Sequence, residues 1–346
     1  MALGITIALI LRSTPSIVAA ESTQNARTRF VRRLPLTFWA GLLILIGSEA
    51  LLVQDLYVTG RGAIHSNAEI QSLRLNHPPT TTLQGIARLV AVNMTPLAWV
   101  GYLLLLEGIL KAQGDSPVRR RPNHFFLLCL ASIFIWCIFD WINFYFIQAW
   151  RYLGFPKAFS QRVLGYFLAF GTIVPGMLLS GQVLLNLGLF ERARSPAWKM
   201  PHWATVISMI AGVVMLAWPF IHRDPITNLT LWNSLVFLLD PLNLWLGRPS
   251  MFRDWQNGWY GRTLAAFSGG LICGLLWEFW NYWALAKWTY RLPFLGAAEH
   301  VRYFEMPVLG LLGFLPFGIE CWIMWQMLRI PLDGLVEPLP NERTLL

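Results

Sequence analysis

The stretch LLWEFWNYWALAKWTY, residues 275–290, places an acid and an amide inside an apolar, aromatic run. Glu278 and Asn281 are three residues apart, so on a helix they share a face and the amide is expected to reach the carboxyl. An ionised carboxyl in an apolar interior is unfavourable unless it is paired. We therefore expect Glu278 to hold a proton near neutral pH, as a general acid must.

The same pattern occurs in the first half of the chain, in FDWINFYFIQAWRY at residues 139–152. Asp140 and Asn143 correspond to Glu278 and Asn281, and both stretches fit [D/E]-x-x-N-x6-W-x-Y. Each pair could also be a polar contact that only holds helices together. Because the pair occurs twice in matched positions, we favour a catalytic role for all four residues.

Tryptophans flank the second acid, and they are the candidate substrate-binding residues. The faces of Trp277, Trp280 and Trp283 could stabilise a cationic group by roughly 2 kcal/mol each when desolvated, or they could simply pack. Trp288 and Tyr290 are also candidates. If the helix continues, they lie about 15–18 Å beyond Glu278, where an interfacial aromatic belt is the favoured interpretation.

The stretch FEMPVLGLLGFLPFGIECW, residues 304–322, adds two acids that the first half lacks. In the alignment that matches Pro175 with Pro316, the counterparts of Glu305 and Glu320 are Leu164 and Leu179. We expect Glu320 to be a further catalytic candidate inside the membrane, and Glu305 to be a cap at the start of a helix. This asymmetry suggests that one half carries the chemistry and that the other is scaffold.

The elements that position these residues are expected to be membrane helices. Of 346 residues, 55% are apolar and 13% are charged, against about 25% charged in soluble domains, and the mean hydropathy is +0.49. Each apolar run is near the roughly 20 residues that a spanning helix needs. The sequence predicts an all-α polytopic membrane protein with about eight spans: 34–58, 85–110, 124–149, 163–190, 203–222, 226–246, 263–287 and 305–328. The run 226–246 could be broken or re-entrant at Asp240 and Pro241.

The spans are expected to form two tandem four-helix repeats, residues 34–190 and 203–328. Besides the acid motifs, Pro175 matches Pro316, and Glu107 and Gly114 match Asp240 and Gly247 in the same order. Because each copy has an even number of spans, both copies have the same orientation in the membrane and are expected to be related by a pseudo-two-fold axis along the membrane normal.

Residues 329–346 are expected to be a cytoplasmic tail. Residues 1–33 are of uncertain status, because residues 1–20 only partly resemble a signal peptide.

The positive charge predicts topology rather than nucleic-acid binding. The net charge is +9, and with eight spans one side holds 17 of the 27 Lys and Arg residues, including RTRFVRR at 27–33 and PVRRRPNH at 117–124. The richer side is expected to be cytoplasmic, so the protein is expected in the cytoplasmic (inner) membrane with both termini in the cytoplasm. Membrane lipids are the expected partners, and the oligomeric state is left open.

The sequence predicts no metal and no cofactor. The six histidines are scattered, no H-x-x-H spacing occurs, and the glycines of FSGGLICG do not form a phosphate-binding loop. The four cysteines lie in apolar runs without a C-x-x-C pair, as free small hydrophobes do.

Two membrane repeats, an acid on a Trp-rich span, the W-x-Y ending and P-x-x-x-E from Pro316 to Glu320 resemble the integral-membrane carotenoid (lycopene) cyclases. The resemblance covers residues 270–325 and, more faintly, 133–180. It implies a cofactor-free proton transfer on a long polyene, with Glu320 or Glu278 as the acid. Members of that group carry paired acids after the proline, whereas here Cys321 follows Glu320.

Three functions remain open from the sequence. The first is a membrane enzyme with acid–base (cyclase-, isomerase- or hydratase-like) chemistry on an isoprenoid or another apolar lipid. The second is a proton- or cation-coupled transporter with Asp140 and Glu278 as its site. The third is a non-catalytic membrane subunit. Apolar aromatics rather than Ser, Thr, Asn and Gln surround the acids, and this favours the enzyme.

Overall fold

A computed structural model describes residues 34–156, 158–336 and 344–345. The possible signal peptide lies outside the described residues, as do residues 337–343 and 346 of the predicted tail. Within the described residues, seven segments are long and apolar enough to cross a membrane. They are Leu36–Thr59, Met94–Ala112, Pro122–Ile147, Phe159–Asn186, His202–Ile221, Gly261–Trp283 and Val308–Leu328. The prediction of a helical membrane protein is therefore confirmed.

The long helices of the first half of the chain are α3 (Leu36–Thr59), α6 (Met94–Ala112), α8 (Pro122–Ile142) and the pair α9 (Phe159–Phe170) and α10 (Ile173–Asn186). Those of the second half are α11 (His202–Ile221), α12 (Asn228–Trp245), α14 (Gly261–Trp283) and α15 (Phe314–Leu328). The short helices are α4 (Asn67–Asn76), α5 (Thr82–Val92), α7 (Pro117–Arg120) and α13 (Met251–Gln256). Helical turns of other types are η2 (Asn143–Ile147), η3 (Pro225–Thr227), η4 (Pro293–His300), η5 (Val308–Gly313) and η6 (Ile330–Leu332).

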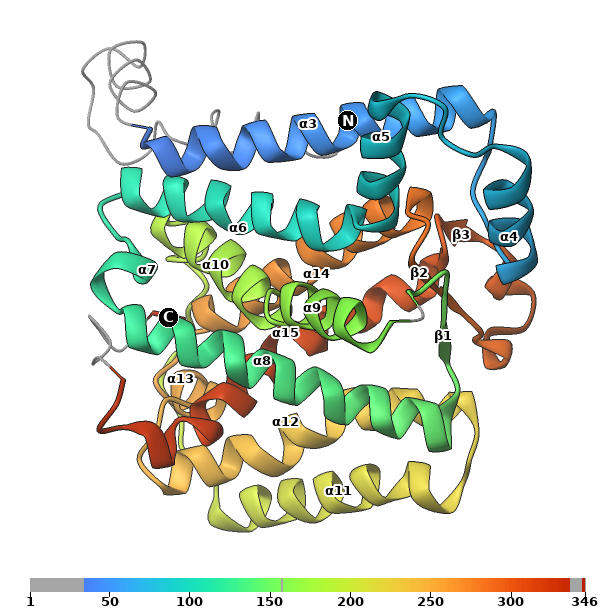
Figure 1. Ribbon diagram of the computed structural model, residues 1–346. Helices are drawn as coiled ribbons and strands as arrows, with labels where there is room; N and C mark the ends of the chain where they lie inside the picture. Colours follow the sequence, from blue (N-terminus) through green and yellow to red (C-terminus); the bar gives the residue numbers. More distant parts are fainter. Residues whose placement is uncertain (1–33, 157, 337–343, 346) are drawn as a thin grey trace.

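The long helices lie roughly alongside one another and alternate in direction (Figure 1). The start of α3, the helices α7 and α13 and the described C-terminal residues lie at one end of the bundle. The opposite end carries α4, α5 and the strands β1 (Trp150–Leu153), β2 (Lys287–Tyr290) and β3 (Arg302–Tyr303). Strands β1 and β2 pair with each other, and β3 pairs with β4 (Met306–Pro307).

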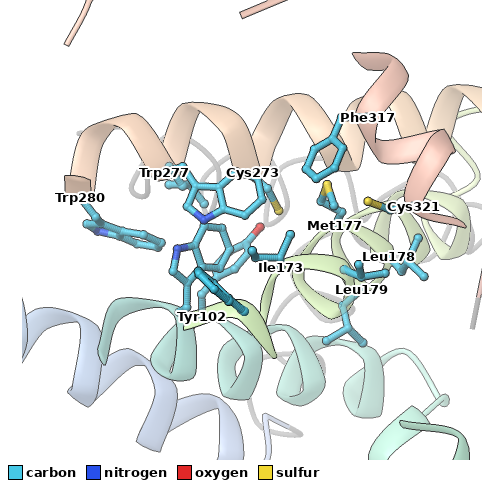
Figure 2. Close-up of a cluster of buried hydrophobic side chains, with 14 of the residues drawn as sticks. Tyr102, Ile173, Met177, Leu178, Leu179, Cys273, Trp277, Trp280, Phe317 and Cys321 are labelled. Atoms are coloured by element: carbon cyan, nitrogen blue, oxygen red, sulfur yellow. The ribbon is translucent and has the colours of Figure 1, made fainter. Parts of the chain in front are cut away.

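The centre of the bundle is α14, which packs between α10 and α15 through two neighbouring glycines. A Cβ at Gly269 would overlap the Met177 carbonyl of α10, and one at Gly270 would overlap the Phe314 carbonyl of α15. Backbones approach this closely only where small residues face each other, as is common in membranes. Figure 2 shows the buried side chains around this contact, including Met177, Cys273 and Phe317. The glycines of FSGGLICG therefore have a packing role.

The outer helices α3 and α11 expose apolar side chains outward. Leu36 and Leu43 of α3 are 83% and 72% exposed, and Ile207 and Val213 of α11 are also exposed. Within the most apolar stretch of each helix, only 28% of the residues of α3 and 17% of those of α11 are buried in the protein. The remaining surface of both helices is therefore suited to contact with lipid.

Several predicted spans have different bounds in the structure. The run 85–110 is divided at Asn93 between α5 and α6, and 263–287 stops being helical at Trp283. The run 226–246 contains one continuous helix, α12, and Pro241 lies in its last turns without ending it. Helix α12 carries Asn and Asp residues that lower its hydropathy, and it is not among the seven spans.

Candidate functional site

The first acid motif closes into a hydrogen-bonded cluster at the end of α8. Asp140 lies in the last turn of the helix, a π-helical turn follows, and Gln148 adopts a left-handed conformation that reverses the chain into β1. The Tyr152 hydroxyl then donates to both Asp140 oxygens, at 2.6 and 2.9 Å, and the Trp150 indole donates to Oδ1 at 3.0 Å. The acid, Trp and Tyr of the motif therefore meet in space.

The second motif closes in a similar way at the end of α14. The helix ends at Trp283, five residues after Glu278, and the chain returns as β2. The Tyr290 hydroxyl donates to Glu278 Oε1 at 2.9 Å, and the Trp288 indole donates to the Tyr290 oxygen at 2.7 Å. The expectation that Trp288 and Tyr290 lie far beyond the acid in an interfacial belt is wrong, because the helix does not continue to them.

The two asparagines hold the returning strands rather than the carboxyls. Asn281 Nδ2 donates to the Trp288 carbonyl at 2.8 Å, and its Oδ1 accepts from the Trp288 N–H at 2.9 Å. Asn143 bonds the Trp150 carbonyl and N–H at 2.8 and 3.2 Å. The expected amide–carboxyl bond is not made, because each amide instead bonds backbone groups of the strand that returns after the helix.

The strands β1 and β2 bring the two clusters side by side. They pair antiparallel, with Trp150 opposite Tyr290 and Tyr152 opposite Trp288. The Trp and Tyr of one motif thus face the Tyr and Trp of the other. Since opposite residues on an antiparallel pair have Cβ atoms about 5 Å apart, the four rings form one contiguous group.

An apolar cavity of about 440 Å³ lies against this group of rings. Its wall takes residues from both halves of the chain, among them Trp277, Trp288 and Tyr290 of the predicted substrate-binding set. The other aromatic residues of the wall are Trp136, Trp150, Tyr152, Phe155, Tyr166, Phe170, Trp232, Phe294, Phe314 and Phe317. A cavity of this size with a mostly apolar wall suits a lipid-like molecule.

Several rings of the wall are packed against one another. Trp232 lies 4.7 Å from Phe317 and 6.1 Å from Trp150, centroid to centroid, and Trp136 lies 6.0 Å from Trp150. Each π face can attract a positive charge. The wall can therefore shelter a cation that develops on a bound hydrocarbon.

The two tyrosines separate the carboxyls from the cavity. Tyr152 and Tyr290 belong to the wall, whereas Asp140 and Glu278 do not. Burial, and then the neighbouring carboxyl, raises the pKa of each tyrosine well above its ordinary value, so both hydroxyls are protonated at neutral pH. Each tyrosine can then pass a proton between its carboxyl and a molecule in the cavity.

Other predicted site residues lie elsewhere. The Trp280 indole faces α3 and donates to Glu49 at 3.2 Å, and its ring packs on Tyr102 (Figure 2). Trp283 packs on Tyr282, and its carbonyl accepts a hydrogen bond from the Arg61 guanidinium. Neither lines the cavity.

Glu320 also lies away from the cavity. It is fully buried in α15, and its carboxyl lies against the backbone of Leu235 in α12. In the described part of the chain, neither of its oxygens makes a hydrogen bond of ordinary geometry. The wall instead takes Pro316 and Phe317 from the same helix.

Sequence reasoning left Trp150 and Tyr152 out of the site, although the repeated motif contains both. The repetition of the motif was the signal that could have assigned Trp150 and Tyr152 to the site. Trp136, Trp232 and Phe317 carried no signal of their own, because they come from three helices that only the fold brings together.

Comparisons of the chain with protein-family models, with curated proteins and with solved structures gave no match.

Proposed function

We propose that the protein is a membrane enzyme that performs acid–base chemistry on an isoprenoid or another unsaturated apolar lipid. The observation that carries the proposal is the aromatic cavity with two tyrosines in its wall, each bonded to a buried carboxyl. Cyclisation of a long polyene, which the sequence resemblance implies, is one reaction of this type. The aromatic wall favours an apolar substrate over a hydrated solute.

The two clusters differ in a way that suggests their roles. In the described residues, both oxygens of Asp140 accept hydrogen bonds, whereas Oε2 of Glu278 accepts none. Because hydrogen bonds donated to a carboxyl favour its ionised form, we assign Asp140 as the base and Glu278 as the acid.

The proposed reaction then needs two proton transfers. The Tyr290 hydroxyl protonates a carbon–carbon double bond while Glu278 replaces the tyrosine's proton. The aromatic wall stabilises the resulting carbocation. Tyr152 passes a proton from the adjacent carbon to Asp140, so a new double bond forms. Asn143 and Asn281 position the two tyrosines through the strands.

We also infer that the chain contains two tandem copies of one unit. Beyond the acid motifs, Glu107 accepts bonds from the Ser116 side chain and the Val118 N–H at the start of α7. Asp240 accepts from Ser250 and from the N–H groups of Met251 and Phe252 at the start of α13. Matched acids therefore cap matched short helices.

We further propose that the membrane is the cytoplasmic one, with both termini in the cytoplasm. The end of the bundle with α7 and α13 carries the basic segment 117–124. Such Lys- and Arg-rich loops mark the cytoplasmic side. The candidate site, near β1 and β2, then lies toward the opposite face.

Incubation of the purified protein with membrane lipids in D2O tests the enzymatic proposal without knowledge of the substrate. Protonation of a double bond by an exchangeable acid places deuterium on carbon, which mass spectrometry detects as a stable mass increase. We expect one class of unsaturated lipid to gain deuterium with the wild type and not with Glu278→Gln. If no lipid gains deuterium in several lipid extracts, the enzymatic proposal is wrong.

A steric variant tests whether the cavity is the site. Gly165 of α9 lines the cavity, and a Cβ there would meet no atom within 4 Å, so Gly165→Phe places a ring in free space. Gly47→Phe is the matched control, since Gly47 of α3 is equally unobstructed and lies outside the cavity wall. Only Gly165→Phe should abolish lipid retention and labelling.

A further inference from the structure

A buried ion pair lies near the end of α14, about one helical turn after Glu278. Lys287 of β2 is completely buried, and its ammonium donates to the Tyr282 carbonyl at 2.9 Å and to the Glu305 carboxylate. The ammonium also lies 5.0 Å from the Tyr282 ring centre. Glu305, expected to cap a helix, therefore neutralises a buried lysine instead.

This pair is close to the proposed acid. Tyr282 follows Glu278 by four residues on α14, so the carbonyl that Lys287 binds is about one helical turn, or 6 Å, from Glu278. Lys287 and Glu278 interact electrostatically, as do Glu305 and Glu278. The flexible four-carbon stem of a lysine can move its amine over such a distance.

The other side of the pair reaches solvent through His65. The His65 Nδ1 lies 3.4 Å from Glu305 Oε1, and the His65 side chain is 57% exposed. Histidine takes up and releases protons near neutral pH. The three residues thus form a series from the surface to one turn from Glu278.

The charges that face Lys287 come from several elements. They are Glu305, Glu278, Arg61 after α3 and Glu69 of α4. Burial lowers the pKa of Lys287 from its ordinary value, while Glu305 acts in the opposite direction. A lysine in such surroundings can alternate between its charged and neutral forms.

The first half of the chain lacks this arrangement. In the alignment that matches Asp140 with Glu278, Lys287 corresponds to Ala149. In the alignment that matches the prolines of the following spans, Glu305 corresponds to Leu164. The series therefore belongs to the Glu278 cluster and not to the Asp140 cluster. Only the acid that donates a proton in the proposed reaction needs to regain one.

We propose that His65, Glu305 and Lys287 carry protons from the aqueous phase to Glu278. The route of the proton is argued from the geometry alone. Its use in a reaction rests on the proposed function. The Lys287 ammonium gives a proton to the Glu278 carboxylate and becomes a neutral amine. Protonated His65 gives a proton to Glu305, which passes it to the amine and restores the ion pair. One proton enters in total, and no group is oxidised or reduced.

Infrared spectroscopy of the full-length protein in membranes tests the path without a substrate. The carboxyl C=O band of protonated Glu278 is the band that disappears in Glu278→Gln, and its shift after transfer to D2O gives the exchange rate. We expect His65→Phe to slow this exchange about 100-fold, the lower end of what a positioned proton-transfer group contributes. His77→Phe, at an exposed histidine that follows α4, should leave the rate unchanged.

Glu320 provides an internal reference, because its band should exchange at the same rate in all these variants. Glu305→Gln leaves Lys287 buried without a counter-charge and could fail to fold. The double variant Lys287→Met, Glu305→Gln removes both charges and should fold and show the same slow exchange.

An unchanged exchange rate in His65→Phe and the double variant would overturn the path, as would the absence of a Glu278 band at every pH at which the protein is folded. Slow exchange in the variants, with no deuterated lipid formed by the wild type, would support the path and contradict the enzymatic function.

Discussion

Asn143 and Asn281 make the same pair of hydrogen bonds to the strand that follows each of them. Each amide donates to a tryptophan carbonyl and accepts from the N–H of that same tryptophan, Trp150 or Trp288. The strand then carries a tyrosine to the carboxyl that precedes the amide by three residues. The amides are thus positioning residues for the tyrosines.

Asn281→Ala should destabilise the fold and release Tyr290 from Glu278. The change leaves the buried N–H and carbonyl of Trp288 without their partner, at a cost of about 1–3 kcal/mol for each group. We expect a melting temperature several degrees lower in detergent, and a similar decrease for Asn143→Ala. Asn76→Ala is the control, since this exposed amide of α4 donates to the Ser72 hydroxyl of its own helix. Equal melting temperatures for all three variants would show that the amides do not hold the strands.

Tyr290→Phe should keep the lipid and lose the chemistry. The ring remains in the cavity wall, but no hydroxyl connects Glu278 to the bound molecule. Deuterium incorporation should fall about 100-fold or more while the amount of co-purified lipid stays the same. Tyr152→Phe should have a similar effect, and Tyr145→Phe, on an exposed side chain, should have none. Full labelling by Tyr290→Phe would remove the tyrosine from the mechanism.

The sequence was sufficient to predict the membrane helices and the two acid motifs. The apolar composition is enough to predict the membrane helices, and the matched spacing of acid, amide, Trp and Tyr is enough to predict the two acid motifs. It was not sufficient to predict the reversal of the chain after Trp283, because WALAKWTY is apolar enough to continue a helix. The reversal depends on Asn281 and on pairing with a strand from the other half of the chain.

The cavity could not be predicted for a related reason. Trp277 and Trp280 are three residues apart on α14 and look equivalent in sequence. In the structure only Trp277 reaches the cavity, while Trp280 meets α6 and the Glu49 carboxylate of α3. Which ring faces a substrate is decided by the neighbouring helices and not by the local pattern.

Gly154→Ala tests the turn that follows β1. Gly154 has φ +71°, and an added Cβ would overlap the Leu285 carbonyl next to β2. We expect a loss of at least about 2 kcal/mol of stability, from backbone strain plus this overlap. Gly85→Ala is a control of opposite sign. Gly85 lies within α5 with open space around it, so alanine should stabilise by about 0.5–1 kcal/mol. Thermal unfolding of the two variants should therefore shift in opposite directions.

Asp254 should make the stability depend on pH at the other end of the bundle. This carboxyl of α13 lies 2.9 Å from Arg262 Nε and accepts from Arg262 Nη2 at 3.1 Å. Burial nevertheless raises its pKa to about 7, with Arg262 opposing the shift. In an unfolded chain an aspartate titrates near pH 3.9. Between these values the folded protein binds more protons than the unfolded one, so its stability falls as the pH rises.

Asp254→Asn lacks this titration, so the difference in unfolding free energy between wild type and variant isolates it. We expect the wild type to lose on the order of 1–4 kcal/mol relative to the variant between pH 4 and pH 8. Asp333→Asn, which removes a half-exposed acid paired with Arg248, controls for the loss of a surface charge. A difference that rises with pH would mean that attraction to Arg262 outweighs burial and keeps Asp254 ionised in the folded protein.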